Sequence, residues 1–425
     1  MRLTNLKVAE QSVSFLQAVQ IGLGKQQGLF FPQSFPQLPV DNLLAMPFQQ
    51  RSQRIMQALI GDELSDAVIG KLVEQAFTFA APLQSVKNNL YCLELFHGPT
   101  LAFKDFGARF MAQAIQQARE LEKTTIVTAT SGDTGAAVAD AFYKQPGIQV
   151  VVLYPEGKVS ALQEKQFSTL GDNILTLAVD GDFDQCQSLV KQVFDDQEVV
   201  SALHVNSANS INISRLLAQV CYYFEAVAQC PPDSREQIVF SVPSGNFGNL
   251  CAGLIAKAMG LPFKRIIAAT NSNDTVPRYW NEGYWQGKPT QATLSNAMDI
   301  SEPNNWPRIE AMLTRGLIAR SDIHAYSVTE ADTETALRAL DKLGYVSEPH
   351  AAVAYSALER DLADNEVGVF LGTAHPAKFK QSVEEILGKT IELPGVLAAC
   401  QKKDSLSERI PADYQQLRKR LLQLR

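Results

Sequence analysis

The sequence is short of cysteine and histidine, and it contains no long apolar run. No uninterrupted apolar segment approaches the roughly 18 residues that cross a bilayer. The opening MRLTNLKVAEQ has no apolar core of the kind that secretory signals need. The six cysteines are scattered without a CxxC pair, so we expect neither a disulfide framework nor a zinc cluster. These absences predict a protein of the reducing cytoplasm.

Positive charge and metal-binding patterns are also scarce. The 38 lysines and arginines are outnumbered by 45 aspartates and glutamates, which leaves a formal net charge of -7. This balance argues against nucleic acid or an anionic membrane as a partner, so an anionic substrate would need cations gathered locally. The five histidines show no spacing that suggests a metal site. His350 and His375 fit helix starts better than catalysis.

What the sequence does contain is a regular alternation of strands and helices. Its 425 residues are too many for one compact core, so two domains are expected. From about residue 90, short β-branched runs alternate with amphipathic patterns, as βαβ units require. Near-continuous apolar runs such as QVVVLY favour strands covered on both faces. The predicted fold is therefore α/β, with two domains of parallel sheets flanked by helices and strands at 91–96, 125–128, 149–154, 174–179, 238–242, 265–269 and 367–371.

Composition shifts divide the chain further. Residues 1–88 show mostly helical patterns and predict an N-terminal helical region. The first part of the large domain is expected at 89–108, the small α/β domain at 109–230 and the rest of the large domain at 231–395, with the polar CPPDSRE break at the crossover. The tail at 396–425 has apolar residues on one helical face, which predicts a helix docked on its own chain.

Three predicted strands end in small-residue turns that open helices: VTATSGDTG at 127–135, VPSGNFG at 242–248 and LGTAHP at 371–376. Exposed amides at helix starts bind phosphates and carboxylates, and such turns gather at the carboxyl edge of a parallel sheet. A single glycine there is more often only a turn former. Three such turns favour a cleft for small anions, and none fits the dinucleotide or triphosphate fingerprints.

Lys104 follows a predicted strand and an irregular HGPT turn, and it starts a helix among Leu101, Ala102, Phe103 and Phe106. Burial disfavours the charged ammonium and lowers its pKa, as a Schiff-base lysine requires. The alternative is a lysine whose side chain extends from the helix start into solvent, which is the commoner case for one lysine taken alone.

Several ordered segments together resemble one family. The segments HGPTLAFKDF, TSGDTG, VPSGNFG and FLGTAHPAKFK closely resemble the threonine synthase family, which belongs to the fold-type II pyridoxal-phosphate enzymes. GLGKQQGLFFP, HVNSANSINISR, TNSNDTVPR and TLSNAMDI are similar to the same family. The similarity runs from the N-terminus to about residue 395, whereas residues 396–425 match no motif.

The resemblance implies a pyridoxal 5'-phosphate site. By the family's pattern, Lys104 carries the cofactor as a Schiff base, and Thr373 faces the pyridine nitrogen with a neutral hydroxyl. The family's phosphate-binding turn falls on Ser244, Gly245, Asn246, Phe247 and Gly248. Small residues there let successive amides converge, and the positive end of the following helix supports them.

The resemblance also implies where the substrate binds. The turn that binds the substrate carboxylate falls on Thr130, Ser131, Gly132, Asp133 and Thr134, although Asp133 serves equally well as a helix cap. The substrate phosphate needs a cation. Arg215 is favoured over Lys158 because its polar neighbours and planar guanidinium suit a phosphate, while the alternative for both residues is a surface charge.

The activity implied is that of a carbon–oxygen lyase acting on phosphates. O-phospho-L-homoserine and water would give L-threonine and phosphate by β,γ-replacement, with Lys104 also acting as general base. One alternative is a dehydratase or phospholyase that releases a 2-oxo acid. Another is a protein that binds pyridoxal phosphate or small anions without turnover, which an intact Lys104 argues against. The pattern predicts a small-molecule substrate and leaves the oligomeric state, any effector and the closure motion open.

Overall fold

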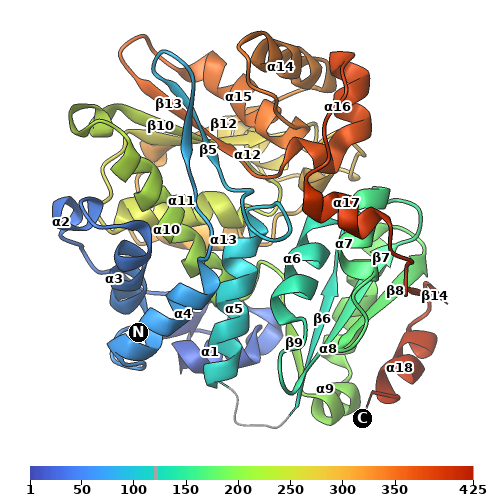
Figure 1. Ribbon diagram of the computed structural model, residues 1–425. Coiled ribbons are helices and arrows are strands. Elements are labelled where there is room, and N and C mark those ends of the chain that lie inside the picture. The colour runs from blue at the N-terminus through green and yellow to red at the C-terminus, as the bar shows by residue number, and fades with distance from the viewer. Residues whose placement is uncertain (119–122, 425) are drawn as a thin grey trace.

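The computed structural model describes residues 1–118 and 123–424, and two open sheets organise them (Figure 1). The first sheet has the order β12-β11-β10-β13-β5-β4, and all its pairs are parallel except β4 with β5. Its strands are β4 (Leu83–Lys87), β5 (Leu90–Glu94), β10 (Ile238–Pro243), β11 (Arg265–Thr270), β12 (Ile323–Ser327) and β13 (Val367–Gly372).

The second sheet is fully parallel, with the order β14-β8-β7-β6-β9. Its strands are β6 (Thr124–Ala129), β7 (Ile148–Pro155), β8 (Ile174–Asp180), β9 (Val205–Ser207) and β14 (Glu408–Pro411). All seven strands predicted from the sequence are present, and the α/β fold class is confirmed. The short strands β9 and β12 and the tail strand β14 were not predicted.

Helices cover both faces of each sheet, which explains the near-continuous apolar runs. Every residue of β10, β11 and β13 is buried. One face of that sheet packs on α14 (Glu330–Lys342) and α15 (Pro349–Asp361), and the other on α10 (Ile213–Gln229), α11 (Gly248–Ala258) and α13 (Trp306–Thr314). The second sheet lies between α5 (Lys104–Ala118), α6 (Asp133–Phe142) and α7 (Ala161–Ser168) on one face and α8 (Phe183–Asp195) and α9 (Gln197–Leu203) on the other.

The central helix α10 brings two predicted site residues together. It is buried along most of its length and packs against α5 and α11. Gly107 on α5 allows a close crossing, because a Cβ added there would lie 2.9 Å from the carbonyl oxygen of Arg215. The crossing places Arg215, on the first turn of α10, near Lys104, the first residue of α5.

The N-terminal segment contains more than the predicted helices. It has α1 (Phe15–Ile21), α2 (Val40–Leu44), α3 (Phe48–Ile60) and α4 (Asp66–Ala76). It also has an antiparallel sheet of β2 (Ser12–Ser14), β1 (Arg2–Asn5) and β3 (Phe30–Pro32), which the sequence did not predict because three or four residues are too few to show alternation. In addition, β4 lies within 1–88 yet joins the six-stranded sheet.

The C-terminal tail returns from the first sheet to the second (Figure 1). After α16 (Lys380–Leu387), helix α17 (Gly395–Gln401) packs on α7, β14 pairs in parallel with β8, and α18 (Tyr414–Leu422) packs on α8 and α9. Leu417 and Leu421 of α18 are fully buried, as expected for a helix docked on its own chain. The remaining α-helix, α12 (Thr275–Glu282), lies between β11 and α13 in the chain. The proposed domain boundaries remain predictions.

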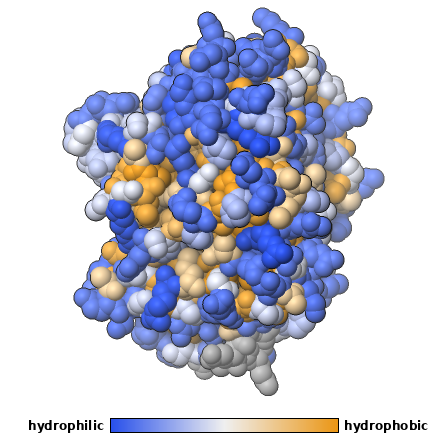
Figure 2. Space-filling view, turned by 90° about the vertical axis from the view of Figure 1, so that its left-hand side faces the viewer, coloured by the Kyte–Doolittle hydropathy of each residue, from blue (hydrophilic) through white to orange (hydrophobic). Residues whose placement is uncertain are grey.

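Polar side chains cover most of the surface shown in Figure 2, and apolar ones form separate patches. Within the described residues, no helix has the length and apolar character needed to span a bilayer.

Candidate active site

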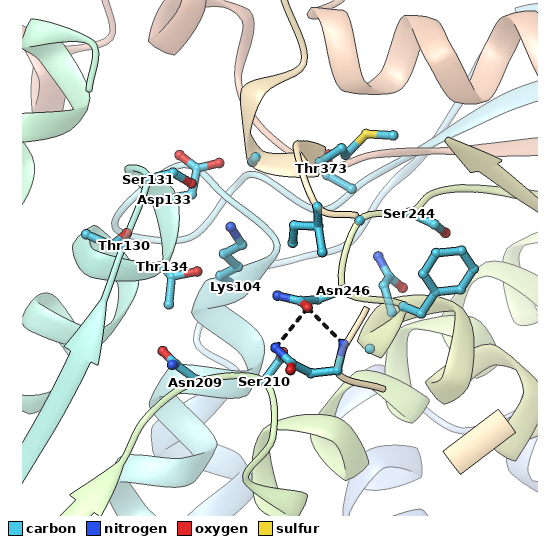
Figure 3. A pocket seen from close by; sticks show the side chains of 18 of the residues that line it. Lys104, Thr130, Ser131, Asp133, Thr134, Asn209, Ser210, Ser244, Asn246 and Thr373 are labelled. Atoms are coloured by element: carbon cyan, nitrogen blue, oxygen red, sulfur yellow. Dashed lines mark hydrogen bonds between the residues drawn. The ribbon is translucent and has the colours of Figure 1, made fainter. Parts of the chain in front are cut away.

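One pocket lies where the carboxyl ends of both sheets meet (Figure 3). The turns after β6, β10 and β13 all contribute to its lining, as the sequence predicted for a parallel-sheet edge. Lys104 lies between the Thr130–Thr134 turn on one side and Asn246 on the other. The pocket therefore brings together Lys104 and the three glycine-rich turns.

Backbone contacts hold Lys104 opposite Thr373. Leu101 adopts a left-handed conformation with φ 58°, which is uncommon for a branched residue. Ala102 forms an isolated antiparallel bridge with Ala374, and the amide of Phe103 donates to the carbonyl of Thr373 at 2.9 Å. The turn before α5 is therefore fixed to the turn after β13.

The environment of Lys104 favours its neutral amine. Burial lowers the pKa of Lys104 to about 8, the nearby Asp133 carboxylate opposes this change, and the cations Arg215 and Lys378 support it. A neutral amine is the form that condenses with an aldehyde. The side chain thus has the chemistry expected of the cofactor-bearing lysine.

The turn from Ser244 to Gly248 has the features of a phosphate site. Among the described residues, no protein acceptor receives a hydrogen bond from the amides of Gly245 to Gly248. Gly245 leaves no space for a side chain, since an added Cβ would lie 2.7 Å from the Cα of Met298. Phe247 takes the left-handed φ of 60° and helix α11 begins directly after it. Unpaired amides at a helix start, in a close-packed turn, fit a phosphate group.

Thr373 and Asn246 complete this side of the pocket. Thr373 is 6% exposed and lies just after β13. The amide oxygen of Asn246 accepts from the backbone N and the side-chain Nδ2 of Asn304, at 3.2 and 3.1 Å (Figure 3). Asn246 therefore links the 301–305 loop to the Ser244–Gly248 turn.

The Thr130–Thr134 turn is rigid. The hydroxyl oxygen of Thr130 accepts from the amides of Gly132 and Gly135, at 2.9 and 2.8 Å. Gly132 has a φ of 140°, and an added Cβ would lie 2.8 Å from the side chain of Gln163. Ser131 and Thr134 line the pocket, so their hydroxyls are available to a ligand carboxylate.

Asp133 does not cap a helix through its side chain. Gly132 is the N-cap of α6, and the Asp133 carboxylate instead accepts from Lys378 at 2.7 Å and from Gln163 at 2.8 Å. Burial alone would raise the pKa of Asp133, but Lys378 and Lys104 hold that pKa well below its usual range. The carboxylate is therefore ionised and paired.

Of the two cations predicted to bind the substrate phosphate, the structure places Arg215 in the pocket and Lys158 outside it. Arg215 is 2% exposed and lines the pocket, and burial lowers its pKa to about 10. One guanidinium nitrogen donates to the carbonyl of Ala208, while Nε is buried without a partner among the described residues. Lys158, by contrast, is exposed in the turn after β7 and does not line the pocket, so the structure does not bring it to the site.

Several lining residues were not predicted. Asn209 and Ser210 lie inside the HVNSANSINISR segment, which could have indicated them. His350 starts α15 as expected, but it also lines the pocket, and its Nε2 accepts from the amide of Ala297 at 3.2 Å. Burial raises the pKa of the lining Asp299 to about 6. Asp299 lies inside the TLSNAMDI segment, which could have indicated it.

Comparisons with known proteins identify the family. The family model described as pyridoxal-phosphate dependent enzyme matches residues 76–371, threonine synthase N terminus matches 4–77, and threonine synthase, C-terminal, matches 351–420. Threonine synthase of Serratia marcescens is 58% identical over 427 residues, with 100% of both chains covered. Threonine synthase of Escherichia coli K12 is 58% identical over 425 residues, with 99% of both covered.

Solved structures of threonine synthases have the same fold as this chain. A crystal structure of threonine synthase from Escherichia coli superposes with a TM-score of 0.97 at 57% identity, with 100% of both chains covered. A structure of threonine synthase from Brucella melitensis with bound pyridoxal phosphate gives a TM-score of 0.92 at 32% identity, covering 100% of this chain and 99% of the other. This chain therefore belongs to the threonine synthase family of pyridoxal-phosphate-dependent enzymes.

Proposed function

We propose that the protein converts O-phospho-L-homoserine and water to L-threonine and phosphate. The observation that carries this proposal is the combination of three features in one pocket. These are the amine of Lys104 with its lowered pKa, the amides of Gly245–Gly248, which donate to no acceptor among the described residues, and the buried guanidinium of Arg215. A cofactor phosphate and a substrate phosphate require two separate anion sites, and these amides and the Arg215 guanidinium support that assignment.

The residues around the pocket suit pyridoxal phosphate. In this proposal Lys104 would carry the cofactor covalently, the amides of Gly245–Gly248 would bind its phosphate, and the hydroxyl of Thr373 would serve its ring nitrogen. When bound, the cofactor supplies an electron sink for the bonds broken at the substrate. A neutral threonine hydroxyl does not keep the ring nitrogen protonated as a carboxylate would, which suits elimination and replacement chemistry.

The chain's own groups then act on the substrate. The amine of Lys104, once displaced, lies next to the substrate carbons and removes the proton from Cα as a general base. Ser131 and Thr134 bind the substrate carboxylate, and Arg215 binds its phosphate, which leaves from Cγ after a proton is lost from Cβ. A proton then returns to Cγ, which becomes the methyl group, water adds at Cβ, and a proton returns to Cα to give threonine. Holding both ends of the substrate fixes which C–H bond faces Lys104.

We also propose that the enzyme works in a cytoplasm. All six cysteines are free, and five of them are buried, which suits a reducing compartment. Neither nucleic acid nor a membrane is expected as a partner of this acidic chain.

The test is to incubate the purified holoenzyme with O-phospho-L-homoserine and to measure phosphate, threonine and 2-oxobutyrate together. Equal amounts of phosphate and threonine are expected, and Lys104→Ala should slow the release of both by about 10²–10⁴-fold. Phosphate with 2-oxobutyrate would instead indicate a phospholyase, and no release of phosphate would indicate a binding protein.

A further inference from the structure

Lys378 and Asp133 form a buried ion pair at the point where the two sheets meet. Lys378 lies in a 3₁₀ turn, η5 (Pro376–Phe379), after β13, and Asp133 starts α6 after β6. The Nζ of Lys378 lies 2.7 Å from Oδ1 of Asp133, and the lysine side chain is fully buried. The same Nζ donates to the carbonyl of Thr100 at 2.7 Å, just before Lys104. One ammonium group therefore links three segments of the pocket.

The carboxylate has no freedom to turn away. Gln163 donates to the same Oδ1 at 2.8 Å and also packs against Gly132, where an added Cβ would lie 2.8 Å from it. A negative charge is thereby fixed inside the turn that we assign to the substrate carboxylate. Without a neutralising cation, that charge would repel the substrate.

We propose that Lys378 is a positioning residue for substrate binding: by pairing with Asp133 it fixes the Thr130–Thr134 turn beside Lys104 and cancels the charge that would repel the substrate carboxylate. This inference rests on the proposed function, in which that turn binds the carboxylate. Lys378 contacts the turn and is not among the residues that line the pocket, so its effect passes through Asp133.

The Lys378–Asp133 pair should have a measurable effect on the pKa of the nitrogen at position 104, because both charges act on it. Facing Lys104 are Asp133 on α6, Lys378 on η5 and Arg215 on α10, while Asp105 on α5 faces Arg215. Asp133 favours a protonated nitrogen at position 104, and Lys378 disfavours it. Removal of Lys378 should therefore raise the pH at which this nitrogen titrates, and removal of Asp133 should lower it. A role in packing alone would not produce shifts of opposite sign.

The experiment compares Lys378→Met, Asp133→Asn and the double variant as holoenzymes, with Lys158→Met as an exposed-lysine control. The absorbance of the bound cofactor is titrated with pH. We expect the midpoint to rise by about one pH unit in Lys378→Met, to fall by a similar amount in Asp133→Asn and to return near the wild-type value in the double variant. Lys158→Met should titrate like the wild type.

Kinetics provide the second readout. Lys378→Met should raise the KM for O-phospho-L-homoserine about tenfold, as expected for an uncompensated like charge, with a smaller change in kcat. The double variant should recover most of this loss. Midpoints that shift in the same direction, or an unchanged midpoint and KM in Lys378→Met, would overturn the inference.

Two further outcomes remain decisive. If Lys378→Met does not fold, the double variant takes its place in the comparison, because it leaves no buried charge unpaired. Its midpoint must then lie above that of Asp133→Asn. A midpoint at or below that of Asp133→Asn would overturn the inference. A wild-type enzyme that makes no threonine would refute the proposed function. The midpoints would then still show whether the pair controls the charge at Lys104.

Discussion

The amide of Phe103 donates a 2.9 Å hydrogen bond to the carbonyl of Thr373, and this contact fixes the two ends of the proposed cofactor site relative to each other. Lys104 follows Phe103 directly, and the adjacent Ala102–Ala374 bridge extends the contact. The amine of Lys104 and the hydroxyl of Thr373 are thus attached to the same short stretch of paired backbone. Because the contact uses the backbone of Thr373, its side chain can be replaced without breaking it.

The first prediction concerns the identity of the cofactor lysine. Borohydride reduction of the holoenzyme, followed by peptide mapping, should place the pyridoxyl group on Lys104. Lys104→Ala should lose about 10²–10⁴-fold in turnover, as expected for loss of a general base. A label on Lys378, a buried lysine whose charge acts on Lys104, would show that Lys378 and not Lys104 carries the cofactor.

The second prediction follows from the pKa of Lys104. Only the neutral amine condenses with the cofactor aldehyde, so capture by the apoprotein should quicken as pH rises and level off above about pH 8. An unperturbed lysine, at 10.5, would continue to quicken beyond pH 10. At pH 7 the lowered pKa should raise the neutral fraction by on the order of a hundredfold.

The measurement is the rate of the absorbance change when pyridoxal phosphate is mixed with apoprotein across this pH range. A parallel reaction with free lysine corrects for the titration of the aldehyde and phosphate. A rate that still rises steeply between pH 9 and 10 would contradict the lowered pKa.

The third prediction concerns the ring nitrogen. Thr373→Asp should keep this nitrogen protonated and slow turnover by roughly tenfold or more, while cofactor content stays near normal. Thr373→Ser retains the hydroxyl and serves as the control, with turnover close to the wild type. The measurements are kcat, cofactor content and the absorbance spectrum. Equal kinetics in the two variants would place Thr373 away from the ring.

The strand-end turns could be predicted from the sequence because their signals are local. Each turn follows a near-continuous apolar run, and each opens a helix with small residues, so the SGNFG and TSGDTG turns were found at the correct sheet edge. The N-terminal sheet was not found, because β2 and β3 have only three residues each. The strand β14 depends on pairing with β8, which lies far away in the sequence.

Lysines 158 and 378 show that the burial of a charged side chain could not be predicted from the sequence. Both lie a few residues after a strand whose neighbours in the sheet are parallel. Only the tertiary structure directs Lys378 inward to Asp133 and Thr100 and leaves Lys158 exposed. Burial of a charge is decided by its distant partner, and one sequence does not contain that pairing in a local pattern.

The last prediction assigns the substrate phosphate to Arg215. This residue is buried in the pocket with its Nε unpaired among the described residues, whereas the proposed cofactor phosphate already has the amides after Ser244. Hydrogen bonds to charged groups contribute roughly 1.5–3 kcal/mol each. Arg215→Met should therefore weaken binding of O-phospho-L-homoserine by at least about tenfold, and inhibition by inorganic phosphate should weaken with it.

The chain offers a matched control in Arg308, which is also fully buried and donates to the carbonyl of Ile211 on the loop before α10. Arg308→Met should lower the midpoint of thermal unfolding while leaving KM and phosphate inhibition near the wild-type values at temperatures where it is folded. Arg215→Met should instead keep its cofactor and lose affinity for both phosphate-bearing ligands. Loss of the cofactor in Arg215→Met, or equal effects of the two substitutions on KM, would mean that Arg215 supports the loop and does not bind the substrate phosphate.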